Sequence, residues 1–287
     1  MPQSTRNVID RISEEYYDLT TAEKKTADYI LRNPRESQFL SIAELAEESG
    51  VAEATVSRFC RRLGYKGYNA FKLAIANATA RQHTGEENLT GQIQENDSIE
   101  EMCRKLYSAD TAAVTETLNL INADQIRRAV QVLMEADKVL CMGQGGSMIL
   151  AEEAAHLFST VSGKFYPVSD SHMQIIATAN MTKKDVLLFF SYSGATRDLV
   201  ETLSVARERG VKIILVTRFA RSPGAELADI VLCCGSNESP LQLSSVPAKL
   251  AQIFLMDVLF TEFCRRNLKS CEEARERVAS ALAEKHL

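Results

Sequence analysis

Residues 186–217 constrain the fold of this chain more than any other stretch. Two short apolar runs, Val186–Phe190 and 211–216, enclose a polar loop and a segment with apolar residues at helical spacing. Parallel strands need a crossover connection, and an amphipathic helix between two apolar runs supplies one. The stretch therefore predicts a strand, a loop, a helix and a second strand, the unit from which a parallel α/β sheet is built.

The loop at 191–196 lies where the first of these strands passes into the helix. It contains the hydroxyl side chains of Ser191, Ser193 and Thr196 together with Gly194. The first amides of a helix have no partners within it, and its start carries about half a positive charge. Hydroxyls and amides that converge there can hold a dianion such as phosphate, and a glycine lets the backbone approach the ligand. The alternative is that Ser193 or Thr196 only caps the helix.

A second loop of this kind follows an expected strand at 138–142. Its Gly143, Gly145 and Ser147 precede a helix, in superficial likeness to a dinucleotide-binding turn. The glycine spacing does not fit GxGxxG, however, and the next strand ends without a well-placed acidic residue, so we expect no nicotinamide cofactor. Because ligands bind at the carboxyl ends of the strands of an open α/β sheet, both loops are expected to line one crevice.

The remaining pattern of the second half fits the same α/β domain. Helices are expected at 98–121, 124–136, 248–263 and 272–287, and further strands at 164–168, 185–190, 212–217 and 230–234. Asp124 is a plausible cap, a turn or short helix begins at Ser222, and a loop that contains Glu238 spans 235–247. The preceding residues 82–97 are polar and are interpreted as a linker.

Composition excludes several classes of protein. A hydrophobic fraction of 45% and a charged fraction of 25% are typical of globular domains, and no apolar run approaches the roughly 20 residues that span a bilayer. Residues 1–12 are too polar for a secretory signal, which predicts a cytoplasmic protein with no membrane partner. The seven cysteines are odd in number and form no CxxC pair. We therefore expect neither a disulfide framework nor a metal site, and interpret most cysteines as small buried residues.

Residues 41–63 predict a helix-turn-helix. Ser41 can cap a first helix with Glu44 three residues later, Gly50 supplies a tight turn, and a second helix runs from about Glu53 through Leu63. Such a pair of helices is a DNA-binding arrangement.

Further helices are expected around this motif. Apolar spacing indicates one at 8–16 and another after a cap at Thr20 or Thr21, which Pro34 ends. A last helix of this half continues through 71–81.

The expected second helix of the motif is basic on its outward side, whereas the first is acidic. An arginine in the major groove can pair bidentately with guanine for about 1–3 kcal/mol of discrimination, and Lys66 with its neighbouring amides could hold a phosphate. The residues predicted to contact DNA are Thr55, Ser57, Arg58, Arg61, Arg62 and Lys66. The alternative is a solvated basic helix in a small bundle. The net charge of −5 argues against a protein coated with nucleic acid but allows a local basic face.

Both halves carry motifs of known families. The first half is similar to the helix-turn-helix domain of RpiR-type transcription regulators, through residues 42–46, 54–60 and 63–67. The second half resembles a sugar isomerase (SIS) domain, a phosphosugar-binding module, through Gly143, Gly145, Ser147 and residues 191–196, 222–223 and 227–229. The order of the domains is also that of the RpiR type, and the resemblance covers nearly the whole chain.

The resemblance implies a regulator that binds an operator in double-stranded DNA and responds to a phosphorylated sugar. An all-α helix-turn-helix bundle would occupy residues 1–81, a linker 82–97, and a three-layer α/β SIS domain with a parallel sheet 98–287. Two copies would pair through the long helices at 98–121 and 248–263. They would bind a pseudo-palindromic site as a dimer, or pair again into a tetramer.

The resemblance also implies ligand residues. The phosphate would be bound by Ser147, Ser191, Ser193 and Thr196, and approached by the backbone of Gly143, Gly145 and Gly194. Possible contacts with the sugar are Asp170, His172 and Gln174, which match a recurrent pattern after the second strand, and Glu238.

The competing interpretation is an aldose–ketose isomerase, which needs a base to move a proton between adjacent carbons. Glu238 is the candidate base, with His172 or His156 as a helper. The sequence shows no strong catalytic set, and an isomerase would leave residues 1–81 without a role, so we predict a sensor and not an enzyme. A third class, a phosphosugar-binding protein that regulates another protein directly, keeps the second domain and removes the DNA contact.

Overall fold

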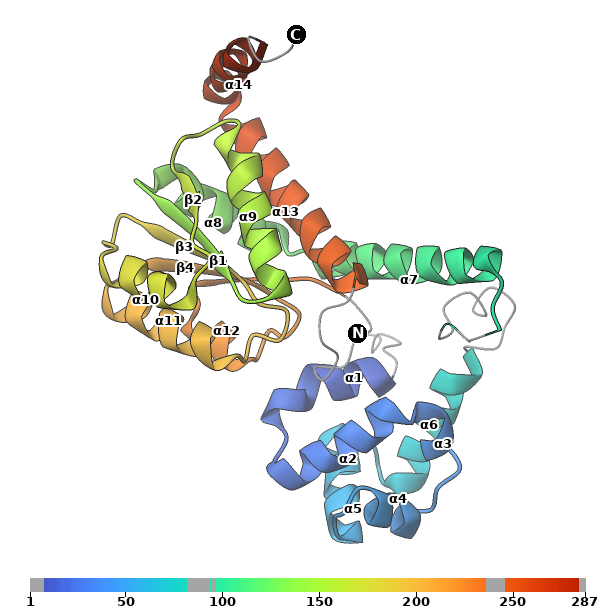
Figure 1. Cartoon of the computed structure of the whole chain (residues 1–287). Helices are drawn as coiled ribbons and strands as arrows, with labels where there is room; N and C mark the ends of the chain where they lie inside the picture. Colours follow the sequence, from blue (N-terminus) through green and yellow to red (C-terminus); the bar gives the residue numbers. More distant parts are fainter. Residues whose placement is uncertain (1–7, 82–92, 94–95, 236–245, 284–287) are drawn as a thin grey trace. The chain divides into compact units, whose positions relative to one another are not determined.

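The computed structural model describes residues 8–81, 93, 96–235 and 246–283, which form two compact units (Figure 1). Among the described residues the first unit ends at Ala109 and the second begins at Asp110, so the division falls within one helix, α7 (Ile99–Leu120). The predicted linker, 82–97, lies largely outside the described residues, and the boundary expected there stays a prediction.

The first unit, up to α7, is helical. Its elements are α1 (Val8–Glu15), the 3₁₀ helix η1 (Tyr16–Asp18), α2 (Thr21–Arg32), α3 (Pro34–Ser37), α4 (Ile42–Glu48), α5 (Glu53–Arg62) and α6 (Tyr68–Arg81). Their apolar sides meet in one core, in which Phe59 and Phe71 are fully buried with their ring centroids 5.6 Å apart, edge to face. Burial of this shared core holds the short helices in place, because isolated helices of such length are marginal in water.

Local sequence signals set several helix ends in this unit. Thr20, one of the two caps expected for α2, forms a capping box with Glu23, and Ser41 forms the predicted one with Glu44. Pro34 ends α2 as expected, but it also begins the short helix α3, which was not predicted. Proline suits the first turn of a helix, since the amide hydrogen it lacks would have no partner there.

The second unit contains a five-stranded parallel sheet, as predicted. The strands are β1 (Val139–Gly143), β2 (Phe165–Pro167), β3 (Val186–Phe190), β4 (Lys212–Thr217) and β5 (Ile230–Cys233), in the order β2-β1-β3-β4-β5. β1, in the second position, pairs with β2 on one side and β3 on the other. The chain therefore adds β2 on one side of β1 and the later strands on the other side.

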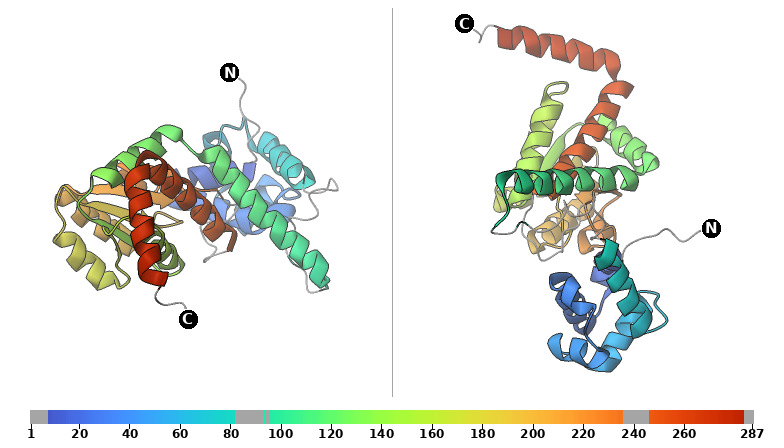
Figure 2. Two further views of the ribbon diagram at one scale, coloured as in Figure 1. Left: turned by 90° about the horizontal axis from the view of Figure 1, so that it is seen from above. Right: turned by 90° about the vertical axis from the view of Figure 1, so that its right-hand side faces the viewer.

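Helices cover both faces of this sheet (Figure 1). On one face lie α8 (Ala123–Glu135), α9 (Gly146–Ser159) and α13 (Val246–Arg266), and on the other α10 (Ser171–Ala179), α11 (Arg197–Glu208) and α12 (Pro223–Leu227). Because successive strand residues face opposite sides, Leu188 joins the first core and Leu187 and Phe189 join the second. The predicted three layers are confirmed. The last helix, α14 (Leu268–Ala283), turns away from the direction of α13 (Figure 2).

Two details of the second unit differ from expectation. No helix was expected around Asp170, but Asp170 caps the helix α10 by accepting a hydrogen bond from the amide of Met173. The cap of α8 is Asn122 and not Asp124, because the Asn122 side chain accepts hydrogen bonds from the amides of Asp124 and Gln125. No helix within the described residues is long and apolar enough to cross a membrane.

Candidate ligand crevice and DNA-binding surface

The two hydroxyl loops follow β1 and β3, the neighbouring strands between which the order of the strands in the sheet reverses. β1 and β3 are parallel neighbours, with Gly143 opposite Phe190 at their carboxyl ends. The helix that follows β1 packs on one face of the sheet and the helix that follows β3 on the other. In open α/β sheets, ligands usually bind where the chain leaves neighbouring strands toward opposite faces.

The first loop is shaped by two glycines. A Cβ on Gly143 would lie 2.6 Å from the Ser147 carbonyl oxygen and 3.0 Å from that of Phe190, so the start of α9 comes too close for a side chain. Gly145 has a φ of 54° and occupies the N-cap position of α9. The loop thereby places Ser147, which is half-buried, in the first turn of this helix.

The hydroxyls of Ser191 and Ser193 accept hydrogen bonds from amides of the second loop itself. Ser191 is buried, and its Oγ accepts a hydrogen bond of 3.2 Å from the amide of Gly194. Ser193 Oγ accepts one of 3.3 Å from Ala195, ahead of the helix. Thr196 is the exposed N-cap residue, but its side chain makes no hydrogen bond to the amides of α11. Neither the Ser193 nor the Thr196 side chain therefore caps this helix through a hydrogen bond.

Gly194 fixes the shape of the second loop. Its φ is 62°, and a Cβ there would lie 2.0 Å from Ser222 Oγ and 2.9 Å from Thr217 Oγ1. The Gly194 carbonyl accepts a hydrogen bond of 2.8 Å from the amide of Gly224, and Ser222 is a buried residue that caps α12. Ser222, which belongs to the part of the predicted motif after β4, thus packs against the second loop.

Gln174 has a structural role that the sequence did not indicate. It is fully buried, and its Nε2 donates hydrogen bonds to the carbonyl oxygens of Val168 (2.7 Å) and Gly143 (3.0 Å). Its Oε1 accepts one of 2.6 Å from Gln144 Nε2. The contacts of Gln174 therefore hold the first loop against α10.

The other predicted sugar contacts are placed differently. Asp170 uses Oδ1 to cap α10, through a hydrogen bond of 2.9 Å from Met173, and His172 is exposed on the first turn of that helix. Glu238 lies outside the described residues. Among the residues the structure describes, no group of three or more His, Cys, Asp or Glu is positioned to hold a metal ion.

The cysteines are mostly small core residues, as predicted. Five of them are buried, and Cys103 on α7 is exposed. Burial raises the pKa of the Cys60 thiol and of the Cys141 thiol to about 12. Both thiols therefore stay protonated at neutral pH and are poor nucleophiles.

The predicted helix-turn-helix is formed by α4 and α5. Gly50 lies between them with a φ of 62°, in the left-handed region that favours glycine. The inward side of α5 is buried through Val56, Phe59 and Cys60. Its outward residues follow the prediction: Arg58 and Arg61 are exposed, and Thr55 and Ser57 are half-buried. Lys66, which follows α5 in the chain, is exposed as well.

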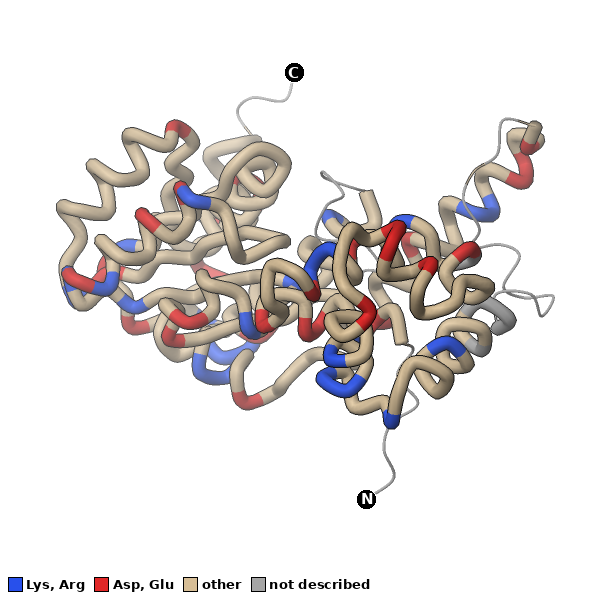
Figure 3. Tube along the Cα trace, turned by 90° about the horizontal axis from the view of Figure 1, so that it is seen from below, with Lys and Arg blue, Asp and Glu red and all other residues tan. Residues whose placement is uncertain are grey.

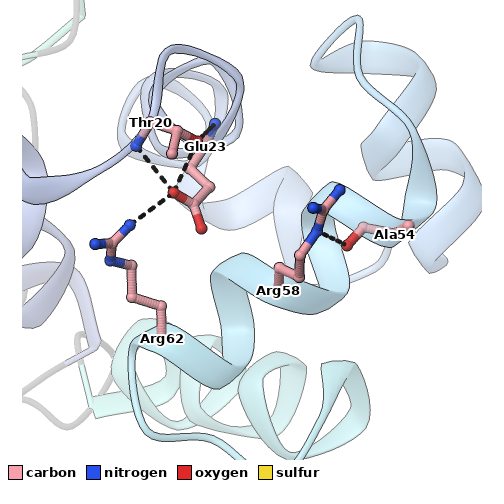
Figure 4. Close-up of polar contacts among 5 residues, drawn as sticks. All are labelled: Thr20, Glu23, Ala54, Arg58 and Arg62. Carbon is pink, nitrogen blue, oxygen red and sulfur yellow. Dashed lines mark hydrogen bonds and ion pairs between the residues drawn. The ribbon is translucent and has the colours of Figure 1, made fainter.

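Arg62 differs from the other arginines of α5 (Figure 4). Its Nη1 lies 3.0 Å from Glu23 Oε2, and the Glu23 side chain is 9% exposed. Glu23 also accepts hydrogen bonds from the amide and hydroxyl of Thr20. Burial disfavours the charged carboxylate, but these hydrogen bonds and the ion pair outweigh it, so the pKa of Glu23 is lowered. Arg62 thus fastens α5 to the start of α2.

Arg58 and Lys66, by contrast, are exposed. Arg58 Nε donates a hydrogen bond to the carbonyl of Ala54, one turn earlier on the same helix. Lys66 lines a shallow hollow at the start of α6, together with Ile42, Gly67 and Tyr68. Basic and acidic positions are interspersed along the trace (Figure 3), in keeping with a net charge of −5, so the basic face is a local one.

Known proteins match both parts of the chain. The family descriptions "Helix-turn-helix domain, rpiR family" and "SIS domain" match residues 6–82 and 132–262. The HTH-type transcriptional regulators HexR of Escherichia coli and Pseudomonas aeruginosa are 30% and 32% identical to it, over 97% and 89% of this chain and 95% and 88% of theirs. The Vibrio vulnificus NanR protein complexed with ManNAc-6P shares the fold, with a TM-score of 0.64 and 24% identity over 98% of this chain and 99% of that one.

These matches define a transcriptional regulator that joins a helix-turn-helix DNA-binding domain to an SIS sugar-phosphate-binding domain. The chain belongs to the RpiR family of such regulators. Relatives that match it over nearly its whole length are regulators and not enzymes, which confirms the prediction of a sensor over an isomerase.

Proposed function

We propose that a phosphorylated sugar binds in the crevice between the loops 143–147 and 191–196 and there controls operator binding. The phosphate is held by Ser147, Ser191, Ser193 and Thr196 and by the first amides of α11. The observation that carries this proposal is the start of α11, which has hydroxyls around it but no side-chain cap. The ManNAc-6P bound to the similarly folded NanR protein supports this class of ligand.

A thermal-shift series tests the ligand. The full chain is mixed with ManNAc-6P, glucose 6-phosphate, ribose 5-phosphate and 6-phosphogluconate, each beside its unphosphorylated counterpart. A ligand at 100 Kd stabilises the folded state by about 2.7 kcal/mol. We expect at least one phosphate to raise the melting temperature while its counterpart does not. Equal shifts for both members of every pair would contradict a phosphate site.

For DNA, we propose that α5 enters the major groove with Thr55, Ser57, Arg58 and Arg61, while Lys66 contacts a phosphate. The exposed charges of Arg58, Arg61 and Lys66 support this. We assign Arg62 to the helix interface and not to the groove, because its guanidinium already pairs with Glu23. A gel-shift titration with DNA from upstream of the chain's own gene tests the contact. We place this action in the cytoplasm, as expected for a DNA-binding regulator.

We further propose that the protein works as a dimer, through α7 and α13. Large apolar side chains are exposed on both helices: Ile99, Leu106 and Tyr107 on α7, and Val246 and Ile253 on α13. A dimer would place two recognition helices about one turn of DNA apart. Light scattering on the full chain tests the mass. A Leu106→Glu variant should shift it toward the monomer, and an unchanged mass would remove this part of α7 from the interface.

A further inference from the structure

Arg218 and Glu116 form an ion pair between the end of β4 and α7. Arg218 Nη2 lies 2.7 Å from Glu116 Oε1, and the two side chains are only 6% and 27% exposed. Breaking a largely buried ion pair by removing one of its members is strongly destabilising. The pair therefore fixes the position of α7 relative to β4 within the second unit.

The backbone of Arg218 contacts the second hydroxyl loop. Its amide donates a hydrogen bond of 3.0 Å to the carbonyl oxygen of Tyr192, which also accepts one of 3.1 Å from Thr217 Oγ1. The ring of Tyr192 packs edge to face against Phe219. Tyr192 lies between Ser191 and Ser193, so the residue that pairs with α7 also holds the middle of the proposed phosphate loop.

The other side of Glu116 is closed by Gly235, at the end of β5. A Cβ on Gly235 would lie 2.6 Å from Glu116 Cβ and 2.8 Å from Glu116 Cδ. The Gly235 amide donates a hydrogen bond of 2.9 Å to Thr117 Oγ1, the next residue of α7. Glu116 is thus held between two strand ends, and a displacement of Arg218 has to move α7 or break the pair.

We propose that the Glu116–Arg218 pair transmits occupancy of the phosphate loop to α7 and so to operator binding. This inference rests on the function proposed above. α7 is the helix through which the chain enters the second unit, since the division between the units falls within it. A ligand that draws in the 191–196 loop shifts the Tyr192 carbonyl, and with it Arg218 and Glu116. Neither charged side chain needs to touch the ligand; both act as positioning residues.

The test measures coupling separately from binding, on the full chain. For the sugar phosphate from the series above that binds best, operator affinity is measured with and without ligand, and ligand affinity with and without operator. Coupling is reciprocal, so both ratios report one quantity, often 5- to 150-fold. In Glu116→Gln we expect both ratios to fall toward one, while the ligand Kd without DNA changes less than threefold.

Three variants complete the design. Glu116→Gln combined with Arg218→Gln removes both charges and leaves none buried, and it should lose the same coupling. Gly235→Ala keeps both charges but displaces Glu116, and it should also change the ratio. Glu201→Gln breaks the exposed Arg197–Glu201 pair on α11 and should behave as the wild type. A wild-type ratio in the double variant would overturn the inference. If the wild-type chain binds no sugar phosphate, the proposed function itself fails.

Discussion

The proposed ligand crevice and the proposed DNA-binding surface differ in how tightly their polar side chains are held. In the proposed crevice, Ser191 is buried and Gly194 lies tightly against the start of α12, so the loop is closely packed and only a small adjustment remains for a ligand to make. On α5, Arg58 and Arg61 are exposed to solvent. A small ligand gains affinity from a preformed site, because little ordering remains to be done on binding. Long basic side chains can adapt to DNA, whose phosphates attract them over a distance.

Gly194→Ala should have the largest effect, because it distorts the backbone of the 191–196 loop itself. The substitution combines a positive φ with a contact of 2.0 Å to Ser222 Oγ, and we expect a loss of about 3 kcal/mol of stability and of phosphosugar binding. Denaturant unfolding and ligand titration measure the two losses. Gly210→Ala is the matched control, since Gly210 has a φ of 71° but the Cβ would meet nothing nearer than 3.8 Å. Equal losses in both variants would show that the Ser222 contact is unimportant.

Ser193→Ala tests the same loop without deforming it. Loss of one hydrogen bond to a charged phosphate should weaken ligand binding by about 1.5–3 kcal/mol, or roughly 10- to 150-fold. Operator affinity without ligand should not change. Isothermal titration with the best sugar phosphate and a gel-shift titration supply the two numbers. An unchanged effector response would place the phosphate elsewhere.

Arg58→Ala tests the adaptable surface. We expect operator affinity to fall by about 1–3 kcal/mol of free energy, with an unchanged melting temperature and unchanged sugar-phosphate binding, because the Arg58 side chain is exposed and its recorded hydrogen bond is to its own helix. Fluorescence anisotropy with operator DNA measures this. Wild-type operator affinity would remove Arg58 from the interface.

Arg62→Met should affect stability and not base preference, the reverse of Arg58→Ala, and the change in free energy should be smaller. Loss of the ion pair to Glu23 should destabilise the first unit by about 1–2 kcal/mol, with little change in base preference. Because the pKa of Glu23 is lowered, its ionised carboxylate stabilises the folded state fully at pH values above the unfolded-state pKa of about 4.3. This stabilisation is lost as the pH falls through the lower pKa of the folded state. The variant should therefore lose less stability than the wild type on acidification. Identical acid titrations would show that the pair does not contribute.

Patterns close together in the sequence predicted most of this fold. The strands around the 191–196 loop and the capping boxes at Thr20 and Ser41 depend on neighbours a few residues away, and all were found as expected. The helix α10 was not predicted, although Asp170 at its start is a typical cap.

Roles that depend on distant partners could not be predicted. Gln174 bridges to Gly143, and Arg62 pairs with Glu23, across 31 and 39 residues of chain. An exposed arginine on a basic helix gives no sign in the sequence that its charge is already neutralised. The ion pair between Glu116 and Arg218 spans 102 residues and becomes visible only when α7 is packed beside β4.

The position of the crevice between α9 and α11 has a consequence for how the second unit melts. α9 belongs to the hydrophobic core on one face of the sheet and α11 to the core on the other. A sugar phosphate bonded to Ser147 and Thr196 together would bridge the two layers. Such a bridge makes it harder for one layer to open while the other stays intact, so a bound ligand should sharpen the thermal transition as well as raise its midpoint.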